Sequence, residues 1–158
     1  MDNKKDNPGV FIPPPLFYIC IFLLSFVLQR LYSIKQAFFF HSLIAIILGV
    51  IFILTSLIFS IPALLQFFKS KNTIVPIKPA SSLQVSGIYS ISRNPMYLGL
   101  LLLYIGMALI FGNWWTVFLI PVLVLLVHFL IIIREEKYLL RAFGSSYSEY
   151  IRKVRRWI

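Results

Sequence analysis

Long apolar runs separated by short polar stretches set the pattern of this chain. Four runs, 11–28, 37–68, 95–112 and 114–133, contain no Lys, Arg, Asp or Glu. Each is close to or above the roughly 20 residues that an α-helix needs to cross a bilayer. The pattern therefore predicts an all-α, polytopic membrane protein with about four transmembrane helices, in which residues 1–158 form a single membrane-embedded domain.

The third and fourth runs are separated by only two residues, Gly112 and Asn113. Glycine and asparagine are typical turn residues, so the two helices are predicted to form a tight antiparallel hairpin. Two tryptophans follow the turn, and tryptophan is enriched at the membrane–water interface. Within the third run, Gly99 and Gly106 share one face of the helix, which indicates close packing against another helix.

The polar tail after the fourth run shows a helical period. Apolar residues recur at spacings of three and four from Tyr138 to Phe143, which is typical of an amphipathic helix. Gly144 is expected to end that helix, and a second short helix is expected over 147–154. The chain thus divides into three parts: N-terminal helices at 10–68, a cytoplasmic loop at 69–94, and a hairpin with cytoplasmic C-terminal helices at 95–158.

The cations are distributed unevenly along the chain, whose formal net charge is +10. Four spans place both termini on one side of the membrane, and only Arg30 and Lys35 then lie on the other side. An excess of Lys and Arg marks the cytoplasmic side. We therefore expect a multi-pass membrane protein with both termini in the cytoplasm. Because the cations flank apolar segments, their expected partner is the membrane surface and not nucleic acid.

Arg93, Asn94 and Pro95 stand directly before the third run. Asparagine followed by proline is typical of an N-cap and a first helical residue. The free N–H groups of such a helix start favour a carboxylate or a phosphate, and Arg93 adds a positive charge. The alternatives are a topological anchor with an ordinary helix start, or a patch that binds lipid headgroups.

Glu135 and Glu136 are adjacent at the end of the fourth run, and the chain has only five acidic residues. Acidic groups at this depth are costly unless they face water, a cavity or a cation. They either pair with nearby cations at a solvated helix end, or bind an ammonium or sulfonium group. His128 lies seven residues before Glu135 and is expected on the same face, either lining a substrate cavity or bonded to a backbone carbonyl.

Other familiar sites are missing from the sequence. It contains no glycine-rich phosphate loop, no cluster of His, Cys and acidic residues with metal-ligand spacing, and no Ser-His-Asp arrangement. No metal is therefore expected. The single cysteine, Cys20, cannot form an internal disulfide.

The ordered stretches "GIYSISRNPMYLG" and "REEKYLLRAFGSSYSEYIRKVRRWI", joined by the hairpin, resemble the isoprenylcysteine carboxyl methyltransferase family and its phospholipid methyltransferase-like bacterial relatives. The resemblance covers about residues 80–158, and its bacterial relatives imply that the membrane is a bacterial inner membrane. It implies methyl transfer from S-adenosylmethionine, with Glu135 near the methionine portion of the cofactor. The implied cofactor-binding residues are Tyr89, Asn94, Pro95, Met96, Tyr97, Gly99 and Glu135, together with part of the loop 81–84, and the implied catalytic residues are Arg93, His128, Glu135 and Glu136.

The resemblance also implies the kind of acceptor: a lipid or a prenylated small molecule that enters sideways from the bilayer. Its nucleophile would attack the methyl carbon directly, and the carbon–sulfur bond would break with the demethylated cofactor as the leaving group. Two positions depart from the family pattern. Asn94 replaces the usual histidine, and Ile131 replaces an arginine that would hold a substrate carboxylate. The alternatives are a phospholipid N-methyltransferase, a nicotinamide-dependent reductase, and a non-catalytic membrane scaffold that retains the fold. The sequence does not define an oligomeric state.

Overall fold

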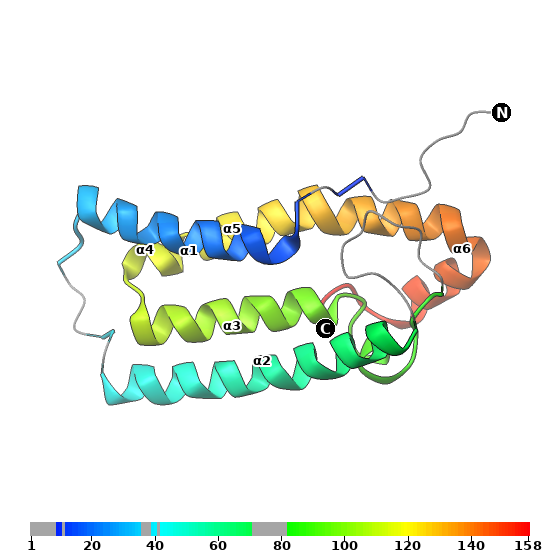
Figure 1. Ribbon diagram of the computed structural model, residues 1–158, viewed down its shortest axis with the longest axis horizontal. Helices are drawn as coiled ribbons and strands as arrows, with labels where there is room; N and C mark the ends of the chain where they lie inside the picture. Colours follow the sequence, from blue (N-terminus) through cyan, green and yellow to red (C-terminus); the bar gives the residue numbers. More distant parts are fainter. Residues whose placement is uncertain (1–8, 11, 36–38, 41, 71–81) are drawn as a thin grey trace.

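The computed structural model describes the chain except for residues 1–8, 11, 36–38, 41 and 71–81 (Figure 1). The described residues form helices and connecting loops without strands, which confirms the all-α prediction. Their elements follow the order α1 Pro14–Leu31, α2 Leu43–Lys69, the 3₁₀-helix η1 Gly87–Ser90, α3 Pro95–Phe111, α4 Trp114–Phe118, α5 Ile120–Val127, the π-helical turn η2 His128–Ile132 and α6 Ile133–Lys153.

Three described helices are long and apolar enough to cross a membrane: α1, α2 and the continuous stretch from α4 to α6. The third predicted span, 95–112, forms α3, an apolar helix of 17 residues. α1 begins with prolines in its first turn, where a missing N–H costs least. The predicted starts of the first two runs, Phe11 and Ala37, lie outside the described residues. Large apolar side chains are exposed along α1 and α2, as expected for helices that face lipid.

Glycines bring α2 and α3 into close contact along their lengths (Figure 1). A Cβ at Gly106 would lie 2.7 Å from the Gly49 carbonyl oxygen and 3.1 Å from the Ile53 backbone nitrogen. A Cβ at Gly99 would lie 2.1 Å from the hydroxyl oxygen of Ser60. The prediction that these two glycines of α3 pack against another helix is therefore confirmed.

The turn between α3 and α4 has a capping box at Asn113. The Asn113 side chain accepts hydrogen bonds from the backbone N–H groups of Trp115 and Thr116, at 2.9 and 3.3 Å. The Thr116 hydroxyl accepts in return from the Asn113 N–H at 3.1 Å. This reciprocal arrangement satisfies the free donors at the start of α4, and it confirms the hairpin.

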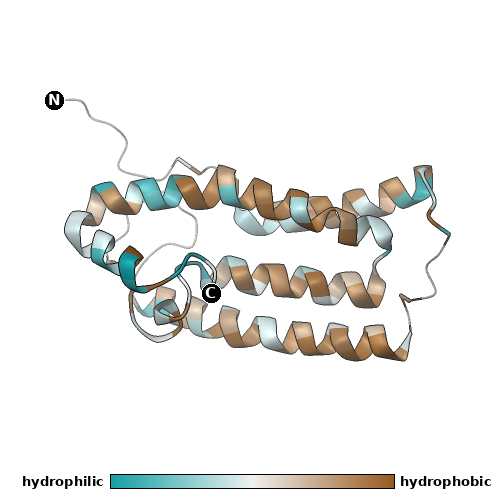
Figure 2. Ribbon diagram, turned by 180° about the vertical axis from the view of Figure 1, so that it is seen from behind, coloured by the Kyte–Doolittle hydropathy of each residue, from teal (hydrophilic) through white to brown (hydrophobic). Residues whose placement is uncertain are grey.

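Parts of the chain that are distant in sequence meet at one end of the bundle. The end of α2, the start of α3, α6 and the C-terminus all lie there (Figure 1). Figure 2 shows hydrophilic residues gathered at this end, whereas α2 and α3 are mainly hydrophobic. Gly144 interrupts α6 with a φ of 50°, so the tail has two helical parts, as predicted. Residues 154–158 then return to the start of α3.

Candidate active site

Glu135 lies at the polar end of the bundle and is held by a chain of two tyrosines. The Tyr97 hydroxyl of α3 donates to Glu135 Oε1 at 2.7 Å. The Tyr18 hydroxyl of α1 donates in turn to the Tyr97 carbonyl at 3.1 Å. The second carboxylate oxygen of Glu135 accepts no hydrogen bond from the described residues. One oxygen is therefore fixed and the other is left for a donor or a cation.

Tyr89 of η1 contributes a second polar group that has no partner in the described parts of the chain. Its side chain is 7% exposed, and its buried hydroxyl makes no hydrogen bond with the described residues. Burial raises the pKa of the Tyr89 phenol above its ordinary value, and the neighbouring Tyr150 and Glu135 raise it further. The phenol therefore keeps its proton at neutral pH. Buried polar groups normally have partners, so this hydroxyl indicates a place for a ligand.

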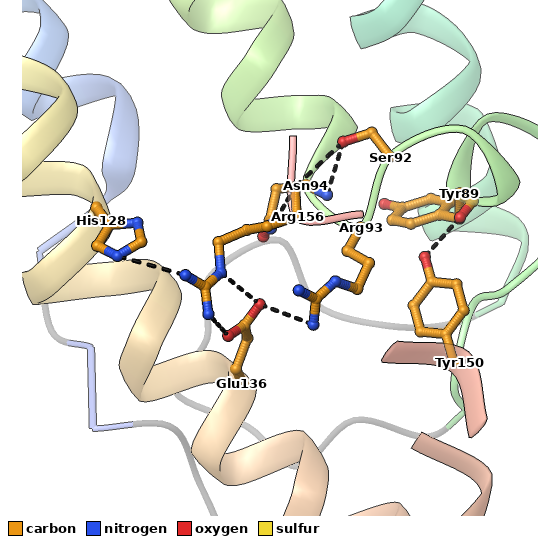
Figure 3. Close-up of polar contacts among 8 residues, drawn as sticks. All are labelled: Tyr89, Ser92, Arg93, Asn94, His128, Glu136, Tyr150 and Arg156. Atoms are coloured by element: carbon orange, nitrogen blue, oxygen red, sulfur yellow. Dashed lines mark hydrogen bonds and ion pairs between the residues drawn. The ribbon is translucent and has the colours of Figure 1, made fainter. Parts of the chain in front are cut away.

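Glu136 is in a different environment from its neighbour (Figure 3). Arg156 donates to both of its oxygens, with Nε 3.0 Å from Oε1 and Nη2 2.6 Å from Oε2. Arg93 Nη1 lies 3.1 Å from Oε1. The side chain of Glu136 is only 14% exposed, and two guanidinium groups surround it. Of the two expectations for the glutamates, pairing with cations of this chain therefore applies to Glu136, but in a largely buried place and with Arg93 and Arg156 as the partners.

Arg93 is also placed differently from the expectation that it supports an anion at the start of α3. Its side chain is 9% exposed and forms an ion pair with Glu136. Its Nε atom is buried and has no partner among the described residues. Arg93 is thus mainly occupied by a carboxylate of this chain.

Asn94 occupies the N-cap position of α3, but its side chain makes no capping hydrogen bond. Its Nδ2 donates instead to the Arg156 carbonyl at 3.0 Å (Figure 3). The prediction of a side-chain cap is therefore wrong, because the Asn94 side chain is hydrogen-bonded to a backbone carbonyl of the C-terminal segment instead. The prediction that Pro95 is the first residue of the helix is confirmed.

His128 begins the π-helical turn η2. A π turn adds one residue to the helical repeat, so His128 is shifted relative to the residues that follow. Its Nε2 lies 3.4 Å from Arg156 Nη1, so Arg156 connects it with Glu136, whereas the expectation places it on the face of Glu135. Within the part of the chain that the structure describes, it bonds no backbone carbonyl of a neighbouring helix. Single π turns often occur at functional sites.

The remaining expected site residues fall into two groups. Met96 packs against a buried cluster that includes Tyr89, Tyr147 and Tyr150, so it borders the site. Gly99 lies against α2 and serves helix packing, and the site proposed below does not include it. Ser81 lies outside the described residues. Sequence reasoning missed Arg156 as a site residue, since the tail carries several cations and no local pattern distinguishes this one.

An apolar groove of about 300 Å³ runs between α1 and α3. It is adjacent to the site through Tyr18, whose hydroxyl contacts the carbonyl of Tyr97. Ile19 and Leu23 at its edge are exposed side chains of a membrane-spanning helix. The side chains that line it include Tyr18, Phe22, Leu100, Leu103, Tyr104 and Met107.

Comparisons with known proteins relate most of this structure to one family. The family model of phospholipid methyltransferases matches residues 44–146. An uncharacterized protein of Haemophilus influenzae is 40% identical over 63 residues, which are 40% of this chain and 100% of that relative. No solved structure matches the chain. The matched range contains Tyr89, Tyr97 and both glutamates, and it ends before Arg156.

Proposed function

Because the chain belongs to the phospholipid methyltransferase family, we propose that it transfers a methyl group from S-adenosylmethionine to a lipophilic acceptor at the membrane surface. The observation that carries the proposal is the pair of incompletely satisfied polar groups at the polar end of the bundle. Among the described residues, Glu135 has one oxygen without a partner, and the buried Tyr89 hydroxyl makes no hydrogen bond. A ligand with both positive charge and hydrogen-bonding groups would satisfy them.

The residues present fit this cofactor. When bound, it supplies a methyl group that a positively charged sulfur makes electrophilic. Glu135 is the carboxylate that would balance positive charge, and Tyr97 fixes its orientation. Tyr89 keeps its proton and can donate to an acceptor group. Its ring, like that of Tyr97, offers an aromatic face to a cation, a contact worth about 1 kcal/mol.

The chain assists the transfer mainly by positioning the reactants. Glu135 is fixed by Tyr97, at the end of the bundle where the end of α2, the start of α3, α6 and the C-terminus meet. Bound in this way, the reacting groups lose less freedom in the transition state. Glu136 is ion-paired with two arginines, so the proposal does not use it as a base. An acceptor that ionises easily or reacts as a free amine needs no base here.

The acceptor is proposed to carry a hydrocarbon chain that lies in the groove between α1 and α3. The groove is apolar and is adjacent to the Tyr97 that holds Glu135. Two acceptor classes follow. A prenylated carboxylic acid agrees with the resemblance of the motifs, whereas the absence of an arginine at Ile131 and the family match favour the amine of a phospholipid.

The site is proposed to face the cytoplasm, because the described cations of α6 and the C-terminal segment gather at this end of the bundle. A single assay tests acceptor and orientation. Membrane vesicles that contain the protein receive radiolabelled S-adenosylmethionine, and the label is followed into extracted lipid. Inverted vesicles are expected to label lipid, and sealed right-side-out vesicles only after permeabilisation.

Acceptors of increasing chain length are then added to the inverted vesicles. Each buried CH₂ contributes about 0.8 kcal/mol, so activity should rise steeply with length for a prenylated acid or a phosphatidylethanolamine. Vesicles without the protein provide the background. Label that enters only water-soluble molecules, with no dependence on chain length, would contradict the proposal of a lipophilic acceptor.

A further inference from the structure

The C-terminal segment, residues 154–158, is built into the candidate site through its backbone. It leaves the end of α6 and returns to the residues before α3 (Figure 1). The Arg93 N–H donates to the Arg155 carbonyl at 3.1 Å. The Arg156 carbonyl accepts from Asn94 Nδ2 at 3.0 Å and from the Ser92 hydroxyl at 3.4 Å. Consecutive residues before α3 therefore hold two consecutive carbonyls of the segment.

The side chain of Arg156 ties the same segment to α6. Its two contacts with the Glu136 carboxylate are bidentate, and such charge-assisted pairs are strong and well defined in geometry (Figure 3). The hydrogen bonds to Glu136 raise the pKa of Arg156, which stays charged. Arg156 thus links the C-terminal segment to two helices, because its carbonyl contacts the residues at the start of α3 while its guanidinium contacts α6.

The pairing has a consequence for the neighbouring carboxylate. Glu135 and Glu136 are adjacent, and only Glu136 has cationic partners among the described residues. Without Arg156, Glu136 would keep Arg93 alone in a largely buried position. A carboxylate that loses a partner in such a place becomes costly and moves or takes up a proton. A displaced Glu136 would compete with Glu135 for positive charge and release the segment from the start of α3.

We propose that Arg156 is a positioning residue of the methyl-transfer site. It acts through Glu136 and Asn94, keeping Glu136 apart from the bound cofactor and the C-terminal segment closed over the start of α3. The inference rests on the proposed function, because it names the residue that arranges the same site. It gives the C-terminal segment, which lies beyond the matched family range, a direct part in cofactor affinity.

The test compares three variants of the full-length protein in detergent. Arg156→Gln removes the charge and the bidentate contact, Arg156→Lys keeps only the charge, and Arg155→Gln removes an adjacent exposed charge as the matched control. Calorimetry gives the Kd for S-adenosylmethionine, and methyl transfer gives KM and kcat. We expect Arg156→Gln to raise Kd and KM at least ten-fold and Arg155→Gln to match the wild type. The Kd and KM of Arg156→Lys should lie between those of the wild type and Arg156→Gln.

A second readout follows the segment itself. Trp157 is partly buried and packs against the core beside α1 and α3, so its emission reports the position of the segment. In a Trp114→Phe, Trp115→Phe background, Arg156→Gln should shift the emission of Trp157 to the red. If Arg156→Gln does not fold, the Glu136→Gln, Arg156→Gln double variant removes the pair together and is measured in the same way.

The outcomes separate this inference from the proposed function. A wild type that binds the cofactor while Arg156→Gln binds it equally well overturns the role of Arg156 and leaves the proposed function standing. Equal weakening by Arg156→Gln and Arg155→Gln overturns it too, because net charge would then explain the effect. If the wild type binds no cofactor, the proposed function fails. If, in addition, the Trp157 emission is unchanged in Arg156→Gln, Arg156 does not hold the C-terminal segment in place, and this inference is overturned as well.

Discussion

Two adjacent residues of the same type have opposite environments in this protein. Both oxygens of Glu136 are held by arginines, whereas Glu135 has one hydrogen bond, from Tyr97, and one oxygen that no described residue contacts. Neighbours on an α-helix point about 100° apart, so the helix alone separates them. The sequence predicted that the pair was exceptional, but it did not distinguish the ion-paired glutamate from the one that faces the site.

Asn94 shows why a local rule is insufficient at the residue scale. The asparagine–proline sequence predicted the helix start correctly, because Pro95 begins α3. It predicted the wrong partner for the Asn94 side chain, which bonds the carbonyl of Arg156. N-cap preferences describe the first turn only, and no local pattern indicates that the C-terminal segment returns to this position.

Asn94 is therefore expected to matter through the C-terminal segment. Asn94→Leu removes the hydrogen bond to the Arg156 carbonyl and should lower the free energy of unfolding by about 1 kcal/mol. It should also raise the Kd for S-adenosylmethionine. Asn94→His keeps a donor and should retain most of both properties. Thermal unfolding and calorimetry of the two variants check this, and equal losses in Asn94→His and Asn94→Leu would exclude the donor as the cause.

At the scale of elements, the π-helical turn η2 explains a wrong prediction. Counting seven residues back from Glu135 assumed an unbroken α-helix, and it placed His128 on the face of Glu135. The π turn at His128–Ile132 shifts the register, so the histidine lies beside Arg156 and Glu136. An apolar run gives no sequence signal for such a turn. Turn residues and glycine are easier to interpret, and they predicted the helical hairpin and the break at Gly144 correctly.

The contact between α2 and α3 provides a prediction at the same scale. Gly106→Ala should lower the free energy of unfolding by about 1–3 kcal/mol, as overpacking usually does, because its Cβ would meet the backbone of Gly49 and Ile53. Gly99→Ala should cost less, since the nearest atom is the end of the Ser60 side chain. Thermal unfolding of both variants in detergent measures the difference.

A paired variant serves as the control for this prediction. Ser60→Ala removes the hydroxyl that a Cβ at Gly99 would meet at 2.1 Å. Ser60→Ala combined with Gly99→Ala should therefore recover stability, whereas Ser60→Ala combined with Gly106→Ala should not. If both double variants recover stability, or neither does, the close approach of α2 and α3 does not determine how much each glycine substitution lowers the free energy of unfolding.

The whole molecule was the most predictable level, because the bilayer constrains it strongly. Apolar runs predicted the membrane-spanning helices, and their connections predicted that the loop before α3 and the tail after α5 meet at one end. The return of residues 154–158 to the start of α3 was not predictable. It depends on contacts between distant residues, such as Arg156 with Glu136, that have no periodic signature.

The measurement that tests the account most directly is a calorimetric titration of the purified protein with S-adenosylmethionine, alongside its demethylated product and a reduced nicotinamide. The wild type should bind the first two and not the third. Glu135→Gln should weaken the binding of S-adenosylmethionine at least ten-fold, or by about 1.4 kcal/mol. Glu149→Gln, at an exposed position of α6, should leave the affinity unchanged. Binding of the nicotinamide alone, or equal affinity in wild type and Glu135→Gln, would contradict the account.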